Sequence, residues 1–117
     1  GGISVTIAPN VTATLRAVNR TKRHTLRSYR VAFNSKAVRG KVRMTLVNSS
    51  GAEVLVIAKG KWARAVEPDS AIAKRWRRIP WRIAPGVYTI KAVFTPHPSL
   101  TTTYAVATMT RAITVRR

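Results

Sequence analysis

The strongest constraint on the fold is the alternation of apolar and polar residues in segments short enough to be β-strands. In the segment 41–47, polar and apolar residues alternate as far as residue 46, so that one set of side chains is expected to face a core and the other to face solvent. Residues 48–51 (Asn-Ser-Ser-Gly) have turn chemistry, and residues 53–58 form a second apolar run, which together predict a β-hairpin. The expected inward set is Val42, Met44 and Leu46, and the expected outward set is Lys41, Arg43 and Thr45.

Similar segments recur along the rest of the chain. About seven short strands separated by turn residues predict an all-β fold, a β-sandwich of antiparallel strands forming a single domain over residues 1–117. Residues 71–79 fit either a short basic helix or a strand, and Pro80 would end a helix there. The other expected strands are 3–7, 11–17, 26–33 with Tyr29, Val31 and Phe33 on one face, 87–94 with Tyr88, Ile90, Ala92 and Phe94 inward, and 104–115 with Ile113 and Val115 inward and a bulge near 108–110.

The charge of the chain points to its partner. The sequence has 22 Lys and Arg against 3 Asp and Glu, a formal net charge of +19. A protein with this charge repels itself, and an anionic neighbour offsets the repulsion. Guanidinium groups bind phosphate and carboxylate in bidentate fashion. The sequence therefore predicts an anionic polymer or an acidic protein surface as partner, with nucleic acid among the polymers that fit.

The inventory of reactive side chains argues against an enzyme. The chain has no Cys, its acids are Glu53, Glu67 and Asp69, and its histidines are His24 and His97. Paired-carboxylate chemistry and thiolate metal sites lack their residues, and the six glycines form no phosphate-binding loop. A serine triad could be drawn from Ser70, His97 and Asp69, but no nucleophile elbow supports it. We expect no catalytic residues, no metal site and no cofactor.

No segment has the pattern of a membrane or export signal. No apolar run approaches about 18 residues, so no membrane insertion is expected. The first residues lack the charged and apolar regions of a signal peptide.

Two segments resemble a known class of module. Residues 85–92 (Pro-Gly-Val-Tyr-Thr-Ile-Lys-Ala) resemble the penultimate strand of bacterial immunoglobulin-like modules, in which a Gly-x-Tyr start places a Tyr at the sheet corner. Residues 42–54 resemble the central hairpin of the immunoglobulin-like domain in flagellar hook-capping proteins, although Trp76, Trp81 and arginines stand where that family has Trp-Asp-Gly. The resemblance, over residues 41–95, implies an immunoglobulin-like β-sandwich. It also implies a non-catalytic role in adhesion, assembly or surface structures, at an extracellular, cell-surface or virion location.

The densest basic and aromatic cluster is the segment 76–82, Trp-Arg-Arg-Ile-Pro-Trp-Arg. Exposed tryptophans there would stack on the rings of a bound polymer while the arginines neutralise its charge. In the alternative, both tryptophans are core or corner residues and only the arginines reach solvent. The candidate residues are Arg75, Arg77, Arg78 and Arg82 for polyanion binding, and Trp76 and Trp81 for stacking.

Two further basic groups are candidate polyanion-binding residues. Lys41, Arg43 and Lys91 lie on the outward faces of two expected strands, and they would form one flat basic face if those strands are neighbours. The alternative is a solvated face that resists edge pairing. A second patch lies in an expected loop, where a run of charge is often merely solvated, and consists of Arg20, Lys22 and Arg23.

Two functions fit these observations. The first is a non-catalytic structural or binding module of an extracellular or virion-type assembly, which docks through basic faces onto an anionic surface or polymer and self-assembles or joins other chains. The second is a sequence-nonspecific nucleic-acid-binding protein such as a small capsid or packaging protein, whose affinity would fall steeply with salt.

Overall fold

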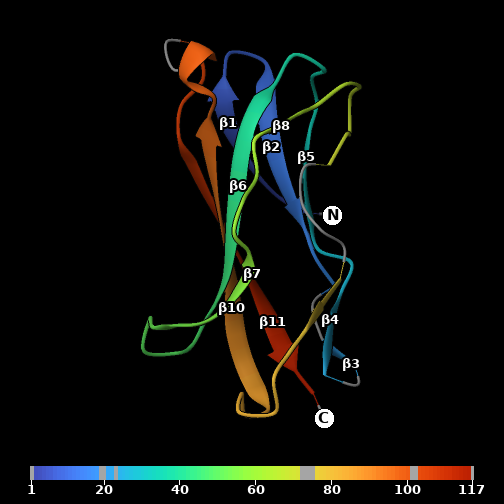
Figure 1. Cartoon of the computed structure of the whole chain (residues 1–117), viewed down its shortest axis with the longest axis vertical. Helices are drawn as coiled ribbons and strands as arrows, with labels where there is room; N and C mark the ends of the chain where they lie inside the picture. Colours follow the sequence, from blue (N-terminus) through green and yellow to red (C-terminus); the bar gives the residue numbers. More distant parts are fainter. Residues whose placement is uncertain (1, 19–20, 23, 72–75, 101–102, 117) are drawn as a thin grey trace.

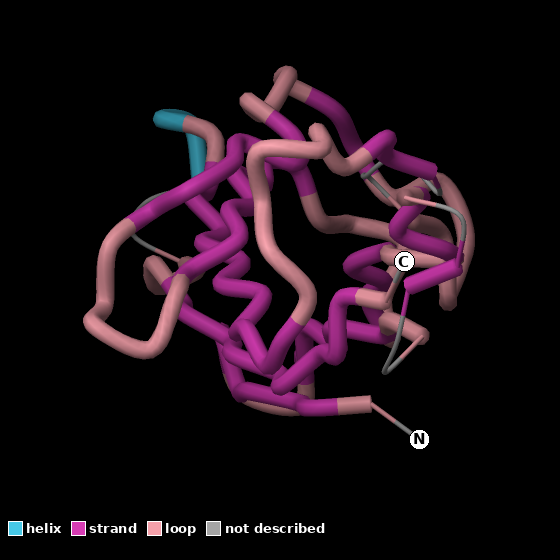
Figure 2. Tube along the Cα trace, turned by 90° about the horizontal axis from the view of Figure 1, so that it is seen from below, coloured by secondary structure: helices cyan, strands magenta, loops and turns pink. Residues whose placement is uncertain are grey.

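The computed structural model describes residues 2–18, 21–22, 24–71, 76–100 and 103–116. Within these residues the chain forms eleven strands, one short 3-10 turn and no α-helix, and every strand pair is antiparallel. The view from below shows the short turn η1 (Pro98–Leu100) at the periphery of the strands (Figure 2). The predicted all-β, antiparallel fold class is confirmed.

The described strands form three sheets. The first sheet has the order β1-β2-β5, the second has the order β11-β10-β6-β7 with β8 also paired to β6, and the third has the order β3-β4-β9 (Figure 1). The strands of the first sheet are β1 (Ile3–Ala8), β2 (Val11–Arg16) and β5 (Arg30–Phe33). Those of the second are β6 (Arg39–Val47), β7 (Glu53–Ala58), β8 (Ala63–Arg64), β10 (Gly86–Pro96) and β11 (Ala107–Val115). Those of the third are β3 (Thr21–Lys22), β4 (Thr25–Arg27) and β9 (Trp76–Arg78).

The hairpin predicted over residues 41–58 is present as β6 and β7. Its turn is held by Asn48, whose side-chain oxygen accepts hydrogen bonds from the backbone of Ser50 and Ala52, while Gly51 has a φ of 86°. A positive φ of this size suits glycine, which explains the turn signal in the sequence. The expected inward residues of both long strands are buried except Tyr88, which is partly buried; the buried ones are Val42, Met44 and Leu46 on β6 and Ile90, Ala92 and Phe94 on β10.

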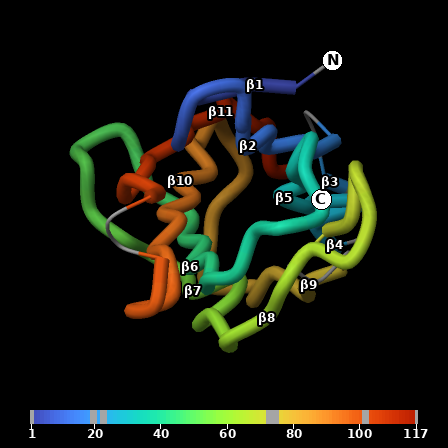
Figure 3. Tube along the Cα trace, turned by 90° about the horizontal axis from the view of Figure 1, so that it is seen from above, coloured from blue at the N-terminus to red at the C-terminus, as the bar shows by residue number. Residues whose placement is uncertain are grey.

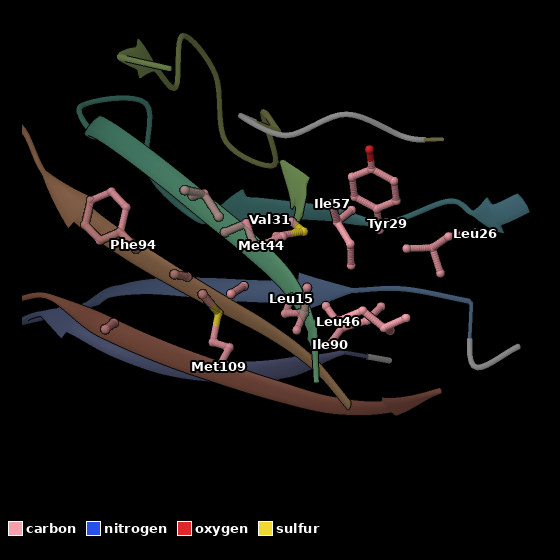
Figure 4. Close-up of a cluster of buried hydrophobic side chains, with 14 of the residues drawn as sticks. Leu15, Leu26, Tyr29, Val31, Met44, Leu46, Ile57, Ile90, Phe94 and Met109 are labelled. Carbon is pink, nitrogen blue, oxygen red and sulfur yellow. The ribbon is translucent and has the colours of Figure 1, made fainter. Parts of the chain in front are cut away.

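The first and second sheets pack face to face in a sandwich-like arrangement. Phe33 of β5 and Phe94 of β10 meet edge to face, with 5.2 Å between their ring centroids. Figure 4 shows Leu15 and Val31 of the first sheet beside Met44, Leu46 and Ile90 of the second. The apolar faces that alternation creates on each sheet are therefore buried against each other.

The third sheet lies beside one end of this sandwich (Figure 1). Leu26, Tyr29 and Ile79, which flank or belong to its strands, are at most 1% exposed and extend the core to that end. Thr21 attaches the sheet to β11, because its buried hydroxyl accepts a 2.6 Å hydrogen bond from the backbone N–H of Arg116. The small sheet thus contributes to the core and is tied to the edge of the second sheet.

Two of the expected strands differ in extent from their predictions. The strand expected over 26–33 is broken, because Ser28 has a φ of 49° and separates β4 from β5. The strand expected from residue 104 starts at Ala107, because the backbone N–H of Ala105 bonds instead to the carbonyl of Ile7 in β1. From Ala107 to Val115 the strand pairs with β10 without a break, so the expected bulge near 108–110 is absent.

The strand count and topology also differ from expectation. The described residues form eleven strands rather than about seven, since β3, β4, β8 and β9 are separate segments of two or three residues. In an immunoglobulin sandwich the strand beside B in the first sheet is E, which follows C in sequence. Here the strand beside β2 is β5, which precedes β6, so the first sheet is a simple meander.

Candidate polyanion-binding surface

All three tryptophans of the chain are exposed. The exposed fractions are 49% for Trp62, 52% for Trp76 and 72% for Trp81. Core positions for Trp76 and Trp81, which the alternative offered beside corner positions, are therefore wrong. The core is filled instead by smaller aromatic and aliphatic side chains, among them Tyr29, Phe33 and Phe94.

Trp76 and Trp81 each lie against a basic side chain. The Arg27 guanidinium is 5.7 Å from the ring centroid of Trp76, and the two residues are directly paired between β4 and β9. The His24 ring lies 3.4 Å from that of Trp81, centroid to centroid. These contacts orient the two rings while much of each residue stays accessible to solvent.

A buried tyrosine holds β9 in place. The Tyr29 hydroxyl donates a 2.9 Å hydrogen bond to the carbonyl of Trp76. Burial raises the pKa of this hydroxyl, against an opposing effect of the nearby Arg77 charge, so the group remains a donor. The exposed ring of Trp76 is thus carried on a backbone that the core anchors.

Arg77 and Arg82 bind the edge of the neighbouring sheet. Arg77 donates from Nε to the carbonyl of Val56 at 3.3 Å, and Arg82 donates from a terminal nitrogen to the carbonyl of Val54 at 2.9 Å. These carbonyls belong to alternate residues of β7, so the two guanidinium groups follow one edge of that strand. They supply donors to an edge that would otherwise be open to another strand. Each guanidinium has five donor hydrogens, so neither is saturated by these contacts.

This edge continues beyond β7. Because β10 pairs with β6 from Gly40 to Val47, both β7 and β8 lie along the other side of β6. A turn at Gly60, with a φ of 92° and packed against Val42, joins the two short strands. We name residues 53–64 the β7–β8 edge. Figure 3 shows β7, β8 and β9 along the same side of the molecule.

Lys41, Arg43 and Lys91 share one face of the second sheet, as predicted if their strands are neighbours. Lys91 of β10 pairs with Thr45, which is two residues from Arg43 on β6. An acid interrupts this face, however, because Arg43 makes two 3.1 Å hydrogen bonds to Glu53. Thr45, expected in solvent, is only 1% exposed, since the ion pair reaches along the strand from Arg43 past its position.

We predict that the Glu53 carboxyl titrates below its ordinary range. Hydrogen bonds from Arg43, with smaller contributions from the charges of Arg43 and Lys91, lower its pKa. The stabilisation from this pair is present above the ordinary pKa of a Glu and is lost as the pH falls through the lowered value. Arg43→Gln should return the pKa toward the ordinary value of a Glu, and Lys91→Gln should raise it less. Side-chain carboxyl NMR titration at low salt measures both, and an ordinary pKa in the unmodified chain would contradict the prediction.

A basic and aromatic cluster around Trp62 was missed from the sequence. The Lys41 ammonium lies 4.8 Å from the Trp62 ring centroid, and the His97 ring meets Trp62 edge to face at 5.3 Å. Backbone pairing brings these residues together, since Lys41 pairs with Thr95 and the N–H of His97 bonds to the carbonyl of Arg39. The sequence indicates this cluster only through the short basic and aromatic segment Lys59-Gly60-Lys61-Trp62, whose glycine is typical of a loop between strands.

The remaining predicted residues divide into those described and those outside the described part. Arg78 is exposed on β9, opposite Thr25. Lys22 lies in β3, also opposite Thr25. Arg20, Arg23 and Arg75 lie outside the described residues.

The described part of the chain holds no group of three or more His, Cys, Asp or Glu placed to bind a metal ion. None of its helical segments is long and apolar enough to cross a membrane. Comparisons with protein-family models, curated proteins and solved structures gave no match for this chain.

Proposed function

We propose that the chain is a non-catalytic structural or binding module of an extracellular, cell-surface or virion-type assembly, which docks onto an anionic polymer or an acidic protein surface. The observation that carries this proposal is the basic and aromatic surface along the β7–β8 edge, in a chain of net charge +19. Arg77 and Arg82 are held on that edge by backbone carbonyls, and exposed Arg64 and Arg78 lie on β8 and β9. A surface of this kind attracts polyanions and offsets self-repulsion when one is bound.

We further propose an immunoglobulin-like origin for the second sheet. Its order β7-β6-β10-β11 matches the C′-C-F-G order of variable-type immunoglobulin sheets. Tyr88, near the start of β10, donates from its hydroxyl to the carbonyl of Ala84 at 2.7 Å, in the manner of a tyrosine corner. These two features support the resemblance to the module of hook-capping proteins over this sheet, whereas the meander of the first sheet departs from it.

The second candidate function is sequence-nonspecific nucleic-acid binding, as in a small capsid or packaging protein. The exposure of all three tryptophans favours it, because aromatic rings beside cations are platforms for nucleobases.

The proposal is tested by fluorescence anisotropy with labelled inorganic polyphosphate. For three to five neutralised phosphates, affinity should fall roughly 20- to 100-fold between about 50 and 200 mM salt. Sedimentation velocity read at 260 and 280 nm on the chain as purified would show whether nucleic acid accompanies it. If the chain binds neither polyphosphate nor an acidic protein such as a polyglutamate-rich carrier at low salt, the proposed function is wrong.

A further inference from the structure

Two of the exposed tryptophans are adjacent in sequence to arginines that contact one sheet edge. Trp81 is adjacent in sequence to Arg82, which bonds to Val54 of β7. Trp76 is adjacent to Arg77, which bonds to Val56, two residues further along the same strand. Beyond the end of β7, Trp62 directly precedes β8. The β7–β8 edge is thus contacted by two arginines that each follow or precede a tryptophan in sequence, while the Trp76 ring lies on the opposite face of β9 from Arg77 and meets Arg27.

The length of this edge suits a polymer rather than a small anion. The edge runs alongside β6 from Val47 to Arg39, a span of about 27 Å at roughly 3.4 Å per residue. Lys59 and Lys61 are exposed between the Arg77 contact and Trp62, and Arg64 is exposed at the far end. Cations are thus present along the whole length.

Each ring also contacts a Lys, Arg or His side chain, which helps to fix its orientation. Lys41 lies over Trp62, Arg27 over Trp76, and His24 against Trp81. About half or more of each tryptophan is nevertheless accessible. Each exposed tryptophan therefore presents an accessible aromatic surface next to a basic side chain, which is the arrangement that stacks on a base.

We propose that the β7–β8 edge binds single-stranded nucleic acid, with bases stacked on Trp62, Trp76 and Trp81 and phosphates on the intervening Arg and Lys side chains. This inference rests on the proposed polyanion-binding function and names its ligand. A polymer that carries charge but no aromatic groups, such as polyphosphate, would contact the Arg and Lys side chains and would not stack on the tryptophan rings. A duplex encloses the faces of its bases, so tryptophan rings could not stack on them without opening the duplex. Single strands offer both phosphates and free base faces.

The test compares two probes on the full chain, a fluorescein-labelled oligothymidylate of about 12 nucleotides and labelled polyphosphate of similar charge. Each of Trp62→Ala, Trp76→Ala and Trp81→Ala should weaken oligothymidylate binding by about tenfold, since stacking contributes about 1–3 kcal/mol per base. The same variants should leave polyphosphate binding nearly unchanged. Addition of oligothymidylate should also quench the tryptophan fluorescence of the unmodified chain.

Matched controls separate stacking from charge and from folding. Arg16→Gln removes one charge from the first sheet, away from the edge, and Arg64→Gln removes one from the edge itself. Arg64→Gln should lower the affinity for both probes more than Arg16→Gln does. Because the three tryptophans are exposed, their variants should retain the circular dichroism spectrum of the original chain.

The outcomes distinguish this inference from the function on which it rests. Binding of polyphosphate with no effect of the tryptophan variants on oligothymidylate would overturn the inference and leave the proposed function standing. Tighter binding of a duplex than of the single strand would also overturn it. Failure of both probes, and of the acidic protein named above, to bind would overturn the proposed function itself.

Discussion

Replacing Phe94 with alanine is expected to lower the free energy of unfolding by about 3–5 kcal/mol. Phe94 is fully buried in the middle of the sandwich and meets Phe33 of the facing sheet. Its removal leaves a cavity between two sheets that are each held by backbone pairing, so neither can collapse into it. Urea unfolding followed by circular dichroism measures the change.

Two further variants make this result interpretable. Phe94→Leu keeps an apolar side chain at the site and should cost clearly less than Phe94→Ala. Val87→Ala, on the same strand at a site that is 68% exposed, should change stability by no more than about 0.5 kcal/mol. Equal effects of Phe94→Ala and Val87→Ala would show that the two sheets do not pack as described.

Replacing Gly40 with alanine is expected to cost about 1–3 kcal/mol through overcrowding. A Cβ atom at Gly40 would meet both the ring of Phe94 and, at 2.5 Å, the carbonyl oxygen of Thr95. The second obstacle is backbone of the paired strand, which cannot rotate away as a side chain can. The same unfolding experiment measures the loss.

The matched control is another glycine-to-alanine change, at Gly51. A Cβ atom there meets nothing within 4 Å, but the φ of 86° is unfavourable for alanine and should cost about 1 kcal/mol. The double variant Gly40→Ala with Phe94→Ala should lose less free energy of unfolding than the sum of the losses in the two single variants, because removal of the ring relieves part of the crowding. Strict additivity would mean that the ring and Gly40 are not in contact.

The elements that could be predicted from the sequence are those that local pattern specifies. Alternation in residues 41–47 and 87–94 identified β6 and β10 and most of their buried residues, because successive side chains of a strand point to opposite faces. Asn48 and Gly51 identified the turn. Alternation failed at Thr45, because a neighbouring ion pair, rather than the strand itself, removes that side chain from solvent.

The candidate surface could be predicted only in part. The segment 76–82 was recognised as basic and aromatic, but its sequence fits exposed and buried tryptophans equally well. Trp62, Lys41 and His97 come from three separate segments, and only the pairing of β6 with β8 and β10 brings them together. Likewise, no local pattern indicates that Arg77 and Arg82 would bond to carbonyls of β7.

Local pattern and composition specify the strand class, the inward faces of the longest strands, the central hairpin and the net charge of +19. These properties depend on residues within a few positions of one another, or on simple sums over the chain. The tertiary structure alone decided the meander of the first sheet, the exposure of the tryptophans and the alignment of cations along the β7–β8 edge. Those features depend on contacts between residues far apart in the chain. Strand pairing and core filling choose among arrangements that local patterns leave equally favourable.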